Sequence, residues 1–360
     1  MTLARLTCRN FRNLEEATWE PGEGSHLLVG DNGAGKTSLL EAIYVAGTTR
    51  SFRTSRLADC RRHGSDHFHL VAEVVGDGRS TLELSSSPDG ATRQLNGNVV
   101  PLTDYLDALP VVSWTDGDFE WISGSPAARR RLIDRGAVSA RPGALTMLTR
   151  YRRALDQKRE LLAGGAVELE PWNEVLSQAA YELISLRRRH IEELAACLSR
   201  IRQEAGESLP EMSLEYRPSP ASSDSPEAVL EAVDRAREGE LARRSPLVGP
   251  HRDELELRWG EHPARKVASL GERKLLGLAV TAARARLVAD RGRNPVVLLD
   301  DLDAALDEGR LEAAWRLFGG FPQVLVTSSR PRIWADFPLG AKSLLACGKL
   351  ASEEPSEEGA

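Results

Sequence analysis

The sequence predicts an α/β fold in which a mixed sheet with flanking helices is joined to an antiparallel β subdomain and carries an inserted α-helical lobe. Three observations support this fold. A short apolar segment, residues 25–30, leads through the glycine loop GDNGAGKTS into a helical pattern, which is half of a βαβ unit. Far downstream, VVLLDD at 296–301 does not alternate, as expected for a buried parallel strand. Long amphipathic helical patterns lie between the two.

The N-terminal third carries mostly strand patterns. Residues 1–20 alternate between apolar and polar side chains and predict a β-hairpin that turns near Asn13. A helix is expected over 36–47, directly after the glycine loop. Three further alternating segments, within 67–75, 80–87 and 92–100, are separated by Gly, Asp and Asn turn signals and predict an antiparallel sheet.

The middle of the chain is helical in pattern. Helices are expected over 125–138, 143–165 and 171–206, and the short link between the last two predicts an antiparallel helical hairpin. A Pro/Ser-rich loop follows at 217–227. The remaining expectations are a strand at 255–260, helices at 268–290 and 308–320, and a buried strand at 323–329.

The glycine loop and VVLLDD lie about 270 residues apart, yet one sheet must hold both. We therefore expect the domain that contains this sheet, called the head below, to be built from two separate parts of the sequence. We expect its N-terminal part, with the antiparallel subdomain, at 1–112. The inserted helical lobe is expected at 113–244 and the C-terminal part of the head at 245–350. The acidic residues 351–360 are expected to form a disordered tail.

Composition and cysteine usage narrow the class of protein. The net charge of -6 excludes a uniformly basic protein but allows a local basic patch. Four scattered cysteines without a C-x-x-C pair argue against structural zinc and disulfides, and a zinc site at His63, His67 and His69 is disfavoured. Because no signal core or long apolar run occurs, we expect a soluble cytoplasmic protein that does not associate with a membrane.

The glycine loop matches the pattern G-x-x-x-x-G-K-[ST] at Gly30, Gly35, Lys36 and Thr37. Glycines let consecutive backbone N–H groups curl around a phosphate, and the helix N-terminus adds partial positive charge. Lys36 would supply a cation to the β- and γ-phosphates, and Thr37 would place a hydroxyl on Mg²⁺. The loop therefore predicts binding of a nucleoside triphosphate.

Two adjacent carboxylates end the buried strand at 296–301. The carboxyl ends of parallel strands form the ligand crevice of such sheets, so Asp300 and Asp301 are expected beside the glycine loop. Side chains alternate along a strand, so the two carboxylates cannot share one role. Asp300 is expected to hold Mg²⁺, directly or through water, and Asp301 to polarise the attacking water.

The succession GDNGAGKTS, ASLGERK, VVLLDD, AALD and VLVTSS resembles the head of an ABC-type P-loop ATPase. The opening RNFRNL and the Asn32 of the glycine loop are similar to its SMC-like branch. TTRSFRTSR, GSPAARRRLIDR, YRRALDQKRELL and GPHRDE are similar to the RecF family, the recombinational-repair ATPases of bacteria. The resemblance spans nearly the whole chain.

The resemblance implies an ATP-dependent DNA-binding protein that forms a head-to-head dimer around two nucleotides, with Mg²⁺ and slow, DNA-stimulated hydrolysis. It implies cooperation with RecR and RecO in loading RecA at single-strand gaps, on duplex DNA and on junctions between single and double strands. It also implies a role in recombination, replication restart and the SOS response to DNA damage.

The resemblance also assigns roles to individual residues. Lys36 and Asp301 would be catalytic, and Thr37 and Asp300 would hold the metal. Asp307 would be the aspartate of the D-loop, and Ser269, Gly271 and Glu272 would form the signature that completes the site of the partner subunit. The nucleotide-binding residues would be Arg12, Asn13, Gly30, Asp31, Asn32, Gly33, Ala34, Gly35, Lys36, Thr37 and Ser38.

Several positions depart from the family pattern. Ala304 and Ala305 replace the more usual Ser-Glu before Leu-Asp, which affects the expected contacts of the D-loop. Gly117 stands where a glutamate is more typical. Thr327 and Ser328 occupy the place of a histidine in many ABC proteins, and a hydroxyl cannot supply imidazole chemistry, which fits slow turnover.

Basic residues greatly outnumber acidic ones between Arg129 and Arg159. Alone, such a stretch is more often a solvated face, but the family context favours sequence-independent contacts to DNA phosphates. The role of GPHRDE stays open between a contact to nucleotide or dimer partner and a structural cap. The candidate DNA contacts are Arg53, Arg56, Arg129, Arg130, Arg131, Arg152 and Arg153.

Two other functions remain as alternatives, namely the ATPase subunit of a transporter and a scaffold with a vestigial nucleotide site. The inserted lobe and RNFRNL argue against the first, and intact Lys36, Thr37, Asp300 and Asp301 argue against the second. Read by itself, ASLGERK is a helix start in which Ser269 and Glu272 fit the capping-box pattern. The resemblance adds that this helix N-terminus faces the γ-phosphate held by a second copy.

Overall fold

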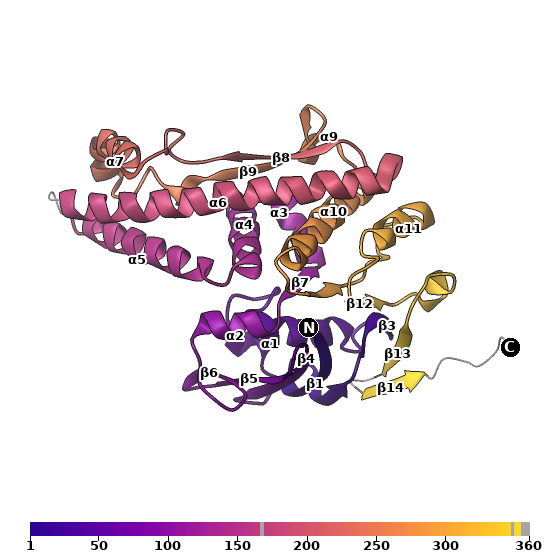
Figure 1. Cartoon of the computed structure of the whole chain (residues 1–360). Helices are drawn as coiled ribbons and strands as arrows, with labels where there is room; N and C mark the ends of the chain where they lie inside the picture. Colours follow the sequence, from indigo (N-terminus) through magenta and orange to yellow (C-terminus); the bar gives the residue numbers. More distant parts are fainter. Residues whose placement is uncertain (166–168, 347–348, 354–360) are drawn as a thin grey trace. The chain divides into compact units, whose positions relative to one another are not determined.

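The computed structural model describes residues 1–165, 169–346 and 349–353 (Figure 1). The chain forms two compact units. The first unit contains 1–119, 201–209 and the chain from Ser269 onward, and the second contains 120–200 and 210–268. No helix in the described part of the chain has the length and apolar character needed to cross a membrane.

An antiparallel sheet of the first unit has the strand order β2-β1-β4-β5-β6. The hairpin predicted for residues 1–20 is confirmed, because Phe11 pairs with Leu14 across a turn made of Arg12 and Asn13. The three further strands predicted after it are confirmed as well. The strands are β1 (Thr2–Phe11), β2 (Leu14–Trp19), β4 (Phe68–Val75), β5 (Arg79–Ser87) and β6 (Gly90–Leu95).

A six-stranded mixed sheet of the same unit has the order β14-β13-β3-β12-β11-β7. Strand β12 lies between β3 and β11 and is parallel to both, so the glycine loop after β3 and the aspartates after β11 leave the same edge of the sheet on either side of β12. The strands are β3 (Gly24–Val29), β7 (Val111–Trp114), β11 (Val296–Leu299), β12 (Gln323–Ser328), β13 (Ala341–Ala346) and β14 (Lys349–Glu353).

The disordered tail predicted for residues 351–360 is wrong at its start. Residues 351–353 belong to β14, which pairs antiparallel with β13, because Lys342, Ser343 and Leu344 of β13 offer them a free strand edge. Residues 354–360 lie outside the described part of the chain. Strand β7, which pairs parallel with β11, was also absent from the sequence prediction.

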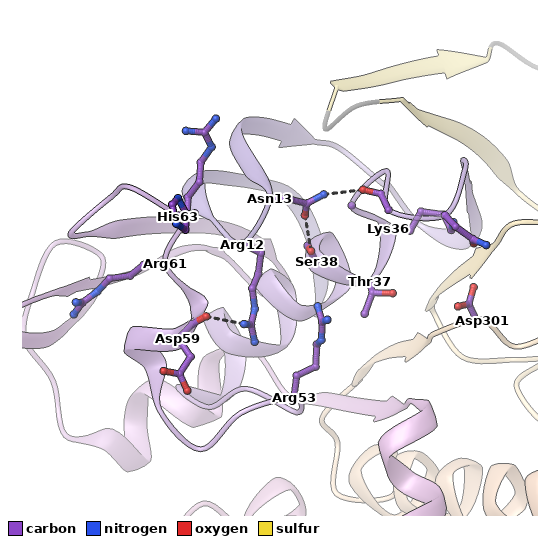
Figure 2. A pocket seen from close by; sticks show the side chains of 14 residues that line it. Arg12, Asn13, Lys36, Thr37, Ser38, Arg53, Asp59, Arg61, His63 and Asp301 are labelled. Carbon is purple, nitrogen blue, oxygen red and sulfur yellow. Dashed lines mark hydrogen bonds between the residues drawn. The ribbon is translucent and has the colours of Figure 1, made fainter.

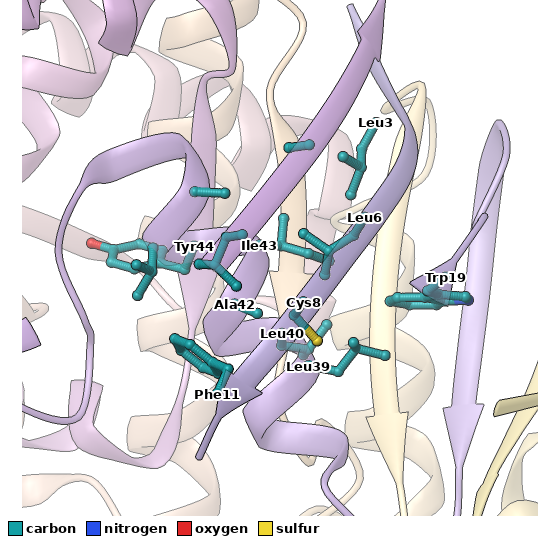
Figure 3. Close-up of a cluster of buried hydrophobic side chains, with 14 of the residues drawn as sticks. Leu3, Leu6, Cys8, Phe11, Trp19, Leu39, Leu40, Ala42, Ile43 and Tyr44 are labelled. Atoms are coloured by element: carbon teal, nitrogen blue, oxygen red, sulfur yellow. The ribbon is translucent and has the colours of Figure 1, made fainter. Parts of the chain in front are cut away.

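Helix α1 (Lys36–Thr48) is buried between the two sheets of the first unit. Its apolar side chains Leu39, Leu40 and Ile43 join one cluster with Leu6 and Phe11 of β1, as Figure 3 shows. The unit also contains α2 (Leu102–Ala108), α10 (Leu270–Ala289), α11 (Glu308–Arg316) and the short turns η1 (Leu57–Cys60), η2 (Asp116–Asp118), η3 (Gly206–Ser208) and η5 (Pro331–Trp334).

A buried glutamine joins the two sheets. The side chain of Gln323 in β12 is fully buried, its Oε1 accepts from the Leu3 N–H at 2.8 Å, and its Nε2 donates to the Leu3 carbonyl at 2.9 Å. The Nε2 also donates to the Gly22 carbonyl. The amide thus supplies the two hydrogen bonds that a neighbouring strand would give Leu3, close to an irregularity in the β1–β4 ladder between Leu3 and Arg5.

The second unit combines helices with a small antiparallel sheet of order β10-β9-β8. Its helices are α3 (Phe119–Ser123), α4 (Pro126–Ala140), α5 (Ala144–Ala163), α6 (Glu170–Ala205), α7 (Pro226–Arg235), α8 (Arg237–Arg243), η4 (Pro250–Arg252) and α9 (Ala264–Val267). Its strands are β8 (Met212–Arg217), β9 (Glu254–Trp259) and β10 (His262–Pro263). Phe119 and the last residues of α6 are assigned to the first unit.

The structure corrects the predicted helical lobe at 113–244. The second unit starts at Glu120 and continues to Ala268, because β8 pairs with β9 some 40 residues later and keeps residues 245–268 with the lobe. The helical hairpin of α5 and α6 is confirmed, since Tyr151 and Leu155 pack on Leu176 and Leu183. The ion pairs Arg141–Glu193 and Arg150–Glu182 agree with this arrangement. The residue number rises from Arg141 to Arg150 while that of the partner falls from Glu193 to Glu182, as antiparallel chain segments require.

Replacing Gln323 by alanine is expected to destabilise the first unit. The change leaves the buried N–H and C=O of Leu3 without partners, which costs about 1–3 kcal/mol for each group. Thermal denaturation should show a clear fall in the melting temperature. Gln203→Ala at an exposed position of α6 is the control, and an equal melting temperature for the two variants would contradict the bridging role.

Candidate nucleotide and metal site

An open cavity of about 930 Å³ lies beside the glycine loop in the first unit (Figure 2). The volume falls within the range of about 300–1,000 Å³ that small-molecule sites occupy. The β1–β2 turn, the glycine loop, the segment 53–63 and the end of β11 surround it. The lining residues are Arg12, Asn13, Asn32, Gly33, Gly35, Lys36, Thr37, Ser38, Arg53, Asp59, Arg61, Arg62, His63 and Asp301.

The glycine loop is held in shape by its own backbone and by the β1–β2 turn. Gly35 has a φ of 110°, and a Cβ there would lie 2.8 Å from Leu14 Cδ2, so a larger residue would be strained and would clash. Asn13 Nδ2 donates to the Gly33 carbonyl at 2.9 Å, and Asn13 Oδ1 accepts from Ser38 Oγ at 2.7 Å. The loop is therefore preorganised before any ligand binds.

The cation of the loop is Lys36, which is buried at the first turn of α1. Its Nζ donates to the main-chain carbonyls of Gly30 at 2.7 Å and Asp31 at 3.1 Å. Ala34 N–H also donates to the Asp31 carbonyl, closing the turn. Both acceptors are neutral groups, so the positive charge of Lys36 remains available to an anion in the cavity.

Glu41 connects the loop helix to the rest of the cavity, and the sequence analysis did not identify it. Its side chain is fully buried on α1, and its carboxylate accepts two hydrogen bonds from the Arg12 guanidinium at 2.9 and 2.6 Å. Ser51 Oγ donates to it as well, and Arg53 lies 3.6 Å away. One buried anion thus positions Arg12 and Arg53 on the cavity wall. Its only sequence signal was a glutamate among apolar residues in LLEAIYV.

Asp300 directly follows β11 and lies beside the first turn of α1 and the end of β12. Its Oδ1 accepts from Thr37 Oγ1 at 3.0 Å and from Thr327 Oγ1 at 2.8 Å. Burial, with the nearby Asp301 charge adding to it against the two threonine hydrogen bonds, raises the pKa of Asp300 to about 6. The sequence analysis noted Thr327 only because many ABC proteins have a histidine at this place. In the structure, the Thr327 hydroxyl holds Asp300 in position through its hydrogen bond.

Asp301 faces the cavity (Figure 2). Asp300 instead accepts a hydrogen bond from Thr37, so the two carboxylates point in different directions. Asp301 has a φ of 45°, an uncommon conformation for a residue other than glycine. Its N–H donates to Thr327 Oγ1 at 2.8 Å. Burial raises the pKa of the Asp301 carboxyl, Lys36 opposes this shift, and Asp303 and Asp116 add to it.

A buried lysine of α10 supports the chain that follows the aspartates, and the sequence analysis missed it too. Lys274 is fully buried, and its Nζ donates to the carbonyls of Asp301 at 2.8 Å and Ala304 at 2.7 Å. Burial lowers the pKa of Lys274, against the carboxylates of Asp116, Asp303, Asp301 and Asp300. The Lys274 ammonium therefore offsets part of the negative charge of these carboxylates.

The predicted signature residues do not line the cavity of their own unit. Ser269 is the N-cap of α10 and forms a capping box with Glu272: Ser269 N–H donates to Glu272 Oε2 at 2.8 Å, and Glu272 N–H donates to Ser269 Oγ at 3.4 Å. A Cβ at Gly271 would lie 3.1 Å from the Ala305 carbonyl. Leu270 is 59% exposed, which leaves this helix start open to solvent.

Asp307 caps helix α11, since its Oδ1 accepts from the Arg310 N–H at 2.8 Å. Arg310 also pairs with Asp307 at 3.0 Å and with Glu272 at 3.6 Å. The aspartate predicted for the D-loop and the predicted signature residue Glu272 are therefore joined through one guanidinium. Ala305, whose carbonyl lies close to Gly271, has a φ of 60°.

The arginines predicted to contact DNA fall into different environments. Arg129 is buried, and Glu254 accepts from its Nε and Nη2 at 2.5 and 3.0 Å, so it serves the fold of the second unit and is not available to DNA. Arg53 lines the nucleotide cavity. Arg131 pairs with Glu120 at 3.0 Å on the surface. Arg56, Arg152 and Arg153 are exposed.

Thr37 and Asp300 fit a magnesium ion. Mg²⁺ prefers hard oxygen ligands and is usually held by one or two protein groups, substrate phosphates and water. A hydroxyl and a carboxylate 3.0 Å apart supply such groups, and a cation there would offset the charge whose burial raises the pKa of Asp300. Among the described residues, no group of three or more His, Cys, Asp or Glu is placed so that it could hold a metal ion.

Together the strand order, the glycine loop and the carboxylates define the class of protein as a P-loop ATPase head of the ABC and SMC type. The family model described as "RecF/RecN/SMC N terminal domain" matches residues 2–338.

Within this class, the chain belongs to the RecF family of DNA replication and repair proteins. It is 34% identical to the DNA replication and repair protein RecF of Acidothermus cellulolyticus, covering 95% of this chain and 97% of that protein. It is also 34% identical to RecF of Anaeromyxobacter sp., covering 85% of this chain and 86% of that one. A solved structure of the recombination mediator protein RecF-ATP in the RecFOR pathway has the same fold, with a TM-score of 0.87 and 23% identity over 98% of this chain and 97% of that chain.

Asp300→Asn is expected to stabilise the protein and to remove metal-dependent activity. Both threonines donate to Oδ1, so an amide oxygen can keep both bonds while the buried charge disappears. A pKa raised from 3.8 to about 6 corresponds to roughly 3 kcal/mol at most, since one pKa unit is worth about 1.36 kcal/mol. We expect a higher melting temperature at pH 7 and at least a hundredfold loss of Mg²⁺-dependent turnover.

The stability gain has a defined pH window. An acid whose folded pKa is raised is destabilising when ionised, so the penalty is full above pH 6 and shrinks as the pH falls towards 3.8. The melting temperatures of Asp300→Asn and the original protein should therefore converge below about pH 4. A constant difference across this range would contradict the charge explanation.

Lys274→Met is expected to destabilise the first unit by about 3–5 kcal/mol, the usual cost of leaving buried charges without their counterion. Denaturant unfolding measures this loss. In the Asp300→Asn background one of the repelling carboxylates is absent, so the same change should cost at least 1 kcal/mol less. Strict additivity of the two changes would show that Lys274 does not act on the acidic cluster.

Proposed function

We propose that this protein is an ATP-dependent DNA-binding protein of recombinational repair and replication restart, and that it hydrolyses ATP to ADP and phosphate. The observation that carries the proposal is the hydrogen bond of Thr37 to Asp300, which unites the glycine loop with the strand-end carboxylates at one cavity. RecF relatives named for DNA replication and repair support the biological role.

The cavity residues can divide the work of phosphoryl transfer to water. Backbone N–H groups of the loop and the Lys36 ammonium would bind the β- and γ-phosphates. Thr37 and Asp300 would hold Mg²⁺, which neutralises charge on the phosphate oxygens. Asp301, whose pKa is raised, would accept a proton from the attacking water and orient it. Arg12 and Asn13 would flank the nucleotide from the β1–β2 turn.

A second copy of the chain would complete the site. Ser269, Gly271 and Glu272 do not line the cavity of their own unit, yet they form a helix start with exposed Leu270. A helix N-terminus attracts anions, so the γ-phosphate of a partner is a suitable ligand. ATP would then hold two heads together on DNA, and hydrolysis would release them.

Turnover is proposed to be slow and DNA-stimulated. The residues at the end of β12 that could face a γ-phosphate are Thr327 and Ser328, which are buried and bonded to Asp300 and Asp303. A hydroxyl in such a bond is a poor proton acceptor. The proposed setting is the bacterial cytoplasm, with RecR and RecO as partners and RecA loading at single-strand gaps as the outcome. Duplex DNA and junctions between single and double strands are the proposed substrates.

The arrangement of the site argues against the two alternatives. A vestigial scaffold would not need Lys36, Thr37, Asp300 and Asp301 in contact with one cavity or one another. A transporter subunit is disfavoured by the second unit, with its long helix α6, and by the family to which the chain belongs.

The experiment that tests the function is the size of the protein in solution, measured by light scattering with and without ATP, Mg²⁺ and duplex DNA. We expect a monomer without ATP and a dimer with ATP and DNA. Asp301→Asn should bind ATP, stop turnover by at least a hundredfold and remain dimeric. Continued hydrolysis by this variant would remove Asp301 from the role of base.

Ser269→Asp separates helix capping from phosphate binding. Aspartate is as good an N-cap as serine, so the fold should be preserved, but its carboxylate would repel the partner's γ-phosphate. We expect unchanged ATP affinity and loss of the ATP-dependent dimer. A dimer of normal stability in this variant would show that the motif only caps α10.

A further inference from the structure

A second cavity, of about 420 Å³, lies in the second unit at the segment GPHRDE. The function proposed above assigns it no role. It is formed by the start of α4, by α5 and by the chain on both sides of η4. The lining residues are Pro126, Arg130, Arg159, Ser245, Pro246, His251, Arg252 and Glu254.

Two arginines of this cavity, Arg130 and Arg252, hydrogen-bond to main-chain carbonyls. Arg130 Nη1 donates to the Asp253 carbonyl at 2.9 Å, and Arg252 Nη2 donates to the Pro246 carbonyl at 3.3 Å. Neither guanidinium makes an ion pair within 4 Å in the described part of the chain. Arg159 pairs only with Asp156 on its own exposed helix face, a contact that contributes little.

Glu254 is the one carboxylate among the described residues of the lining, and its charge is already met. Both of its oxygens accept from Arg129, at 2.5 and 3.0 Å. Its Oε1 also accepts from the Leu255 N–H at 2.9 Å. The cavity therefore has a net positive lining.

His251 lines the cavity as a neutral side chain that two hydrogen bonds hold in place. Its Nε2 lies 3.3 Å from the Pro246 carbonyl, which can only accept, so Nε2 carries the hydrogen and Nδ1 accepts from the Tyr151 hydroxyl at 2.7 Å. Burial and the three cavity arginines lower the pKa of His251 to about 4. Gly249 has a φ of 138°, and a Cβ there would lie 2.6 Å from Tyr151 Oη, so only glycine fits at this position beside Tyr151.

The first turn of α4 adds to the positive potential. Pro126 occupies its first helical position after the Ser125 cap, and Arg130 follows one turn later. A helix N-terminus carries partial positive charge. Guanidinium groups with free N–H donors have the geometry that phosphate oxygens prefer.

The same face of α5 continues the positive charge beyond the cavity. Arg152 precedes Arg159 by seven residues, so the two lie on one face of the helix about 10 Å apart. Arg152 is exposed. A single small anion would use only the cavity, whereas a polymer with a phosphate on each unit can meet both positions.

We propose that this cavity is a phosphate-binding site that takes one backbone phosphate of DNA through Arg130, Arg252 and Arg159. The inference rests on the DNA binding proposed above and assigns it a defined contact in the second unit. The site positions the duplex without reading its sequence, because phosphates carry no sequence information.

The test compares Arg130→Gln/Arg252→Gln with the original protein in binding a fluorescein-labelled 30-base-pair duplex, followed by anisotropy at several salt concentrations with ATP present. We expect at least tenfold weaker binding and a salt dependence lower by about one phosphate contact. Affinity for a fluorescent ATP analogue should not change. Arg235→Gln/Arg243→Gln, at exposed positions of α7 and α8 outside the cavity, removes the same charge and is the matched control.

Equal DNA affinities of the two double variants would overturn the inference while leaving the proposed function intact. Failure of the original protein to bind DNA under any condition would instead overturn the proposed function itself. Arg252→Gln alone is the safeguard against misfolding, because within the described residues the Arg252 guanidinium bonds only to the Pro246 carbonyl. It should lower DNA affinity at an unchanged melting temperature.

A free phosphate is distinguished from DNA in a Lys36→Ala background, in which the nucleotide cavity is disabled. The probe is pyrophosphate, and the readout is the melting temperature. A shift of several degrees that disappears with Arg130→Gln/Arg252→Gln, together with unchanged DNA affinity, would identify a free phosphate as the ligand and overturn the DNA assignment.

Discussion

The site depends on one hydrogen-bonded group, in which Thr37 and Thr327 both donate to Asp300 Oδ1. Thr37 lies in the first turn of α1, after the glycine loop that follows β3, Thr327 lies near the end of β12, and Asp300 directly follows β11. The strands β3, β12 and β11 are adjacent and parallel. Their register pairs Val29 with Ser328 and Leu299 with Val326, which places Thr327 level with Asp300. Residues 263 positions apart in sequence thus meet because strand order and register leave them at the same edge. The insertion of the whole second unit between them does not disturb this.

Concentrating carboxylates at this edge has a cost, which the fold offsets locally. Asp116 and Asp301 raise the pKa of Asp300, which burial has already raised. Three cations offset these negative charges: Lys274 of α10, Lys36 of the glycine loop, and Arg330, which pairs with Asp303 at 2.8 Å. The two non-glycine residues with positive φ in this segment, Asp301 and Ala305, lie next to the carbonyls that Lys274 holds. Backbone strain of this kind persists where surrounding contacts fix it, and it is typical of functional sites.

Sequence alone predicted the elements with strong local patterns. The glycine loop, the hairpin around Asn13, β11 and α10 were all foreseen, because their spacing and apolar runs are visible within a few residues. Strand β7 was missed because four residues carry too little pattern, and the lobe was bounded wrongly because the pairing of β8 with β9 is non-local. Glu41 and Lys274 were missed for a related reason. A lone charge in an apolar helix shows that a partner exists but not which one. Counting arginines likewise could not tell buried Arg129 from exposed Arg152.

The residues predicted for the signature, at the start of α10, and for the D-loop, at the start of α11, are linked by direct contacts. Arg310 joins Asp307 at the start of α11 to Glu272 at the start of α10, while Lys274 of α10 holds the carbonyls of Asp301 and Ala304. The close approach of Gly271 to the Ala305 carbonyl is one more such contact. These contacts connect the backbone of Asp301 at one end with the exposed helix start at Ser269 and Leu270 at the other. The small residues Ala304 and Ala305 fit this arrangement, since the contacts run through their carbonyls and not through their side chains.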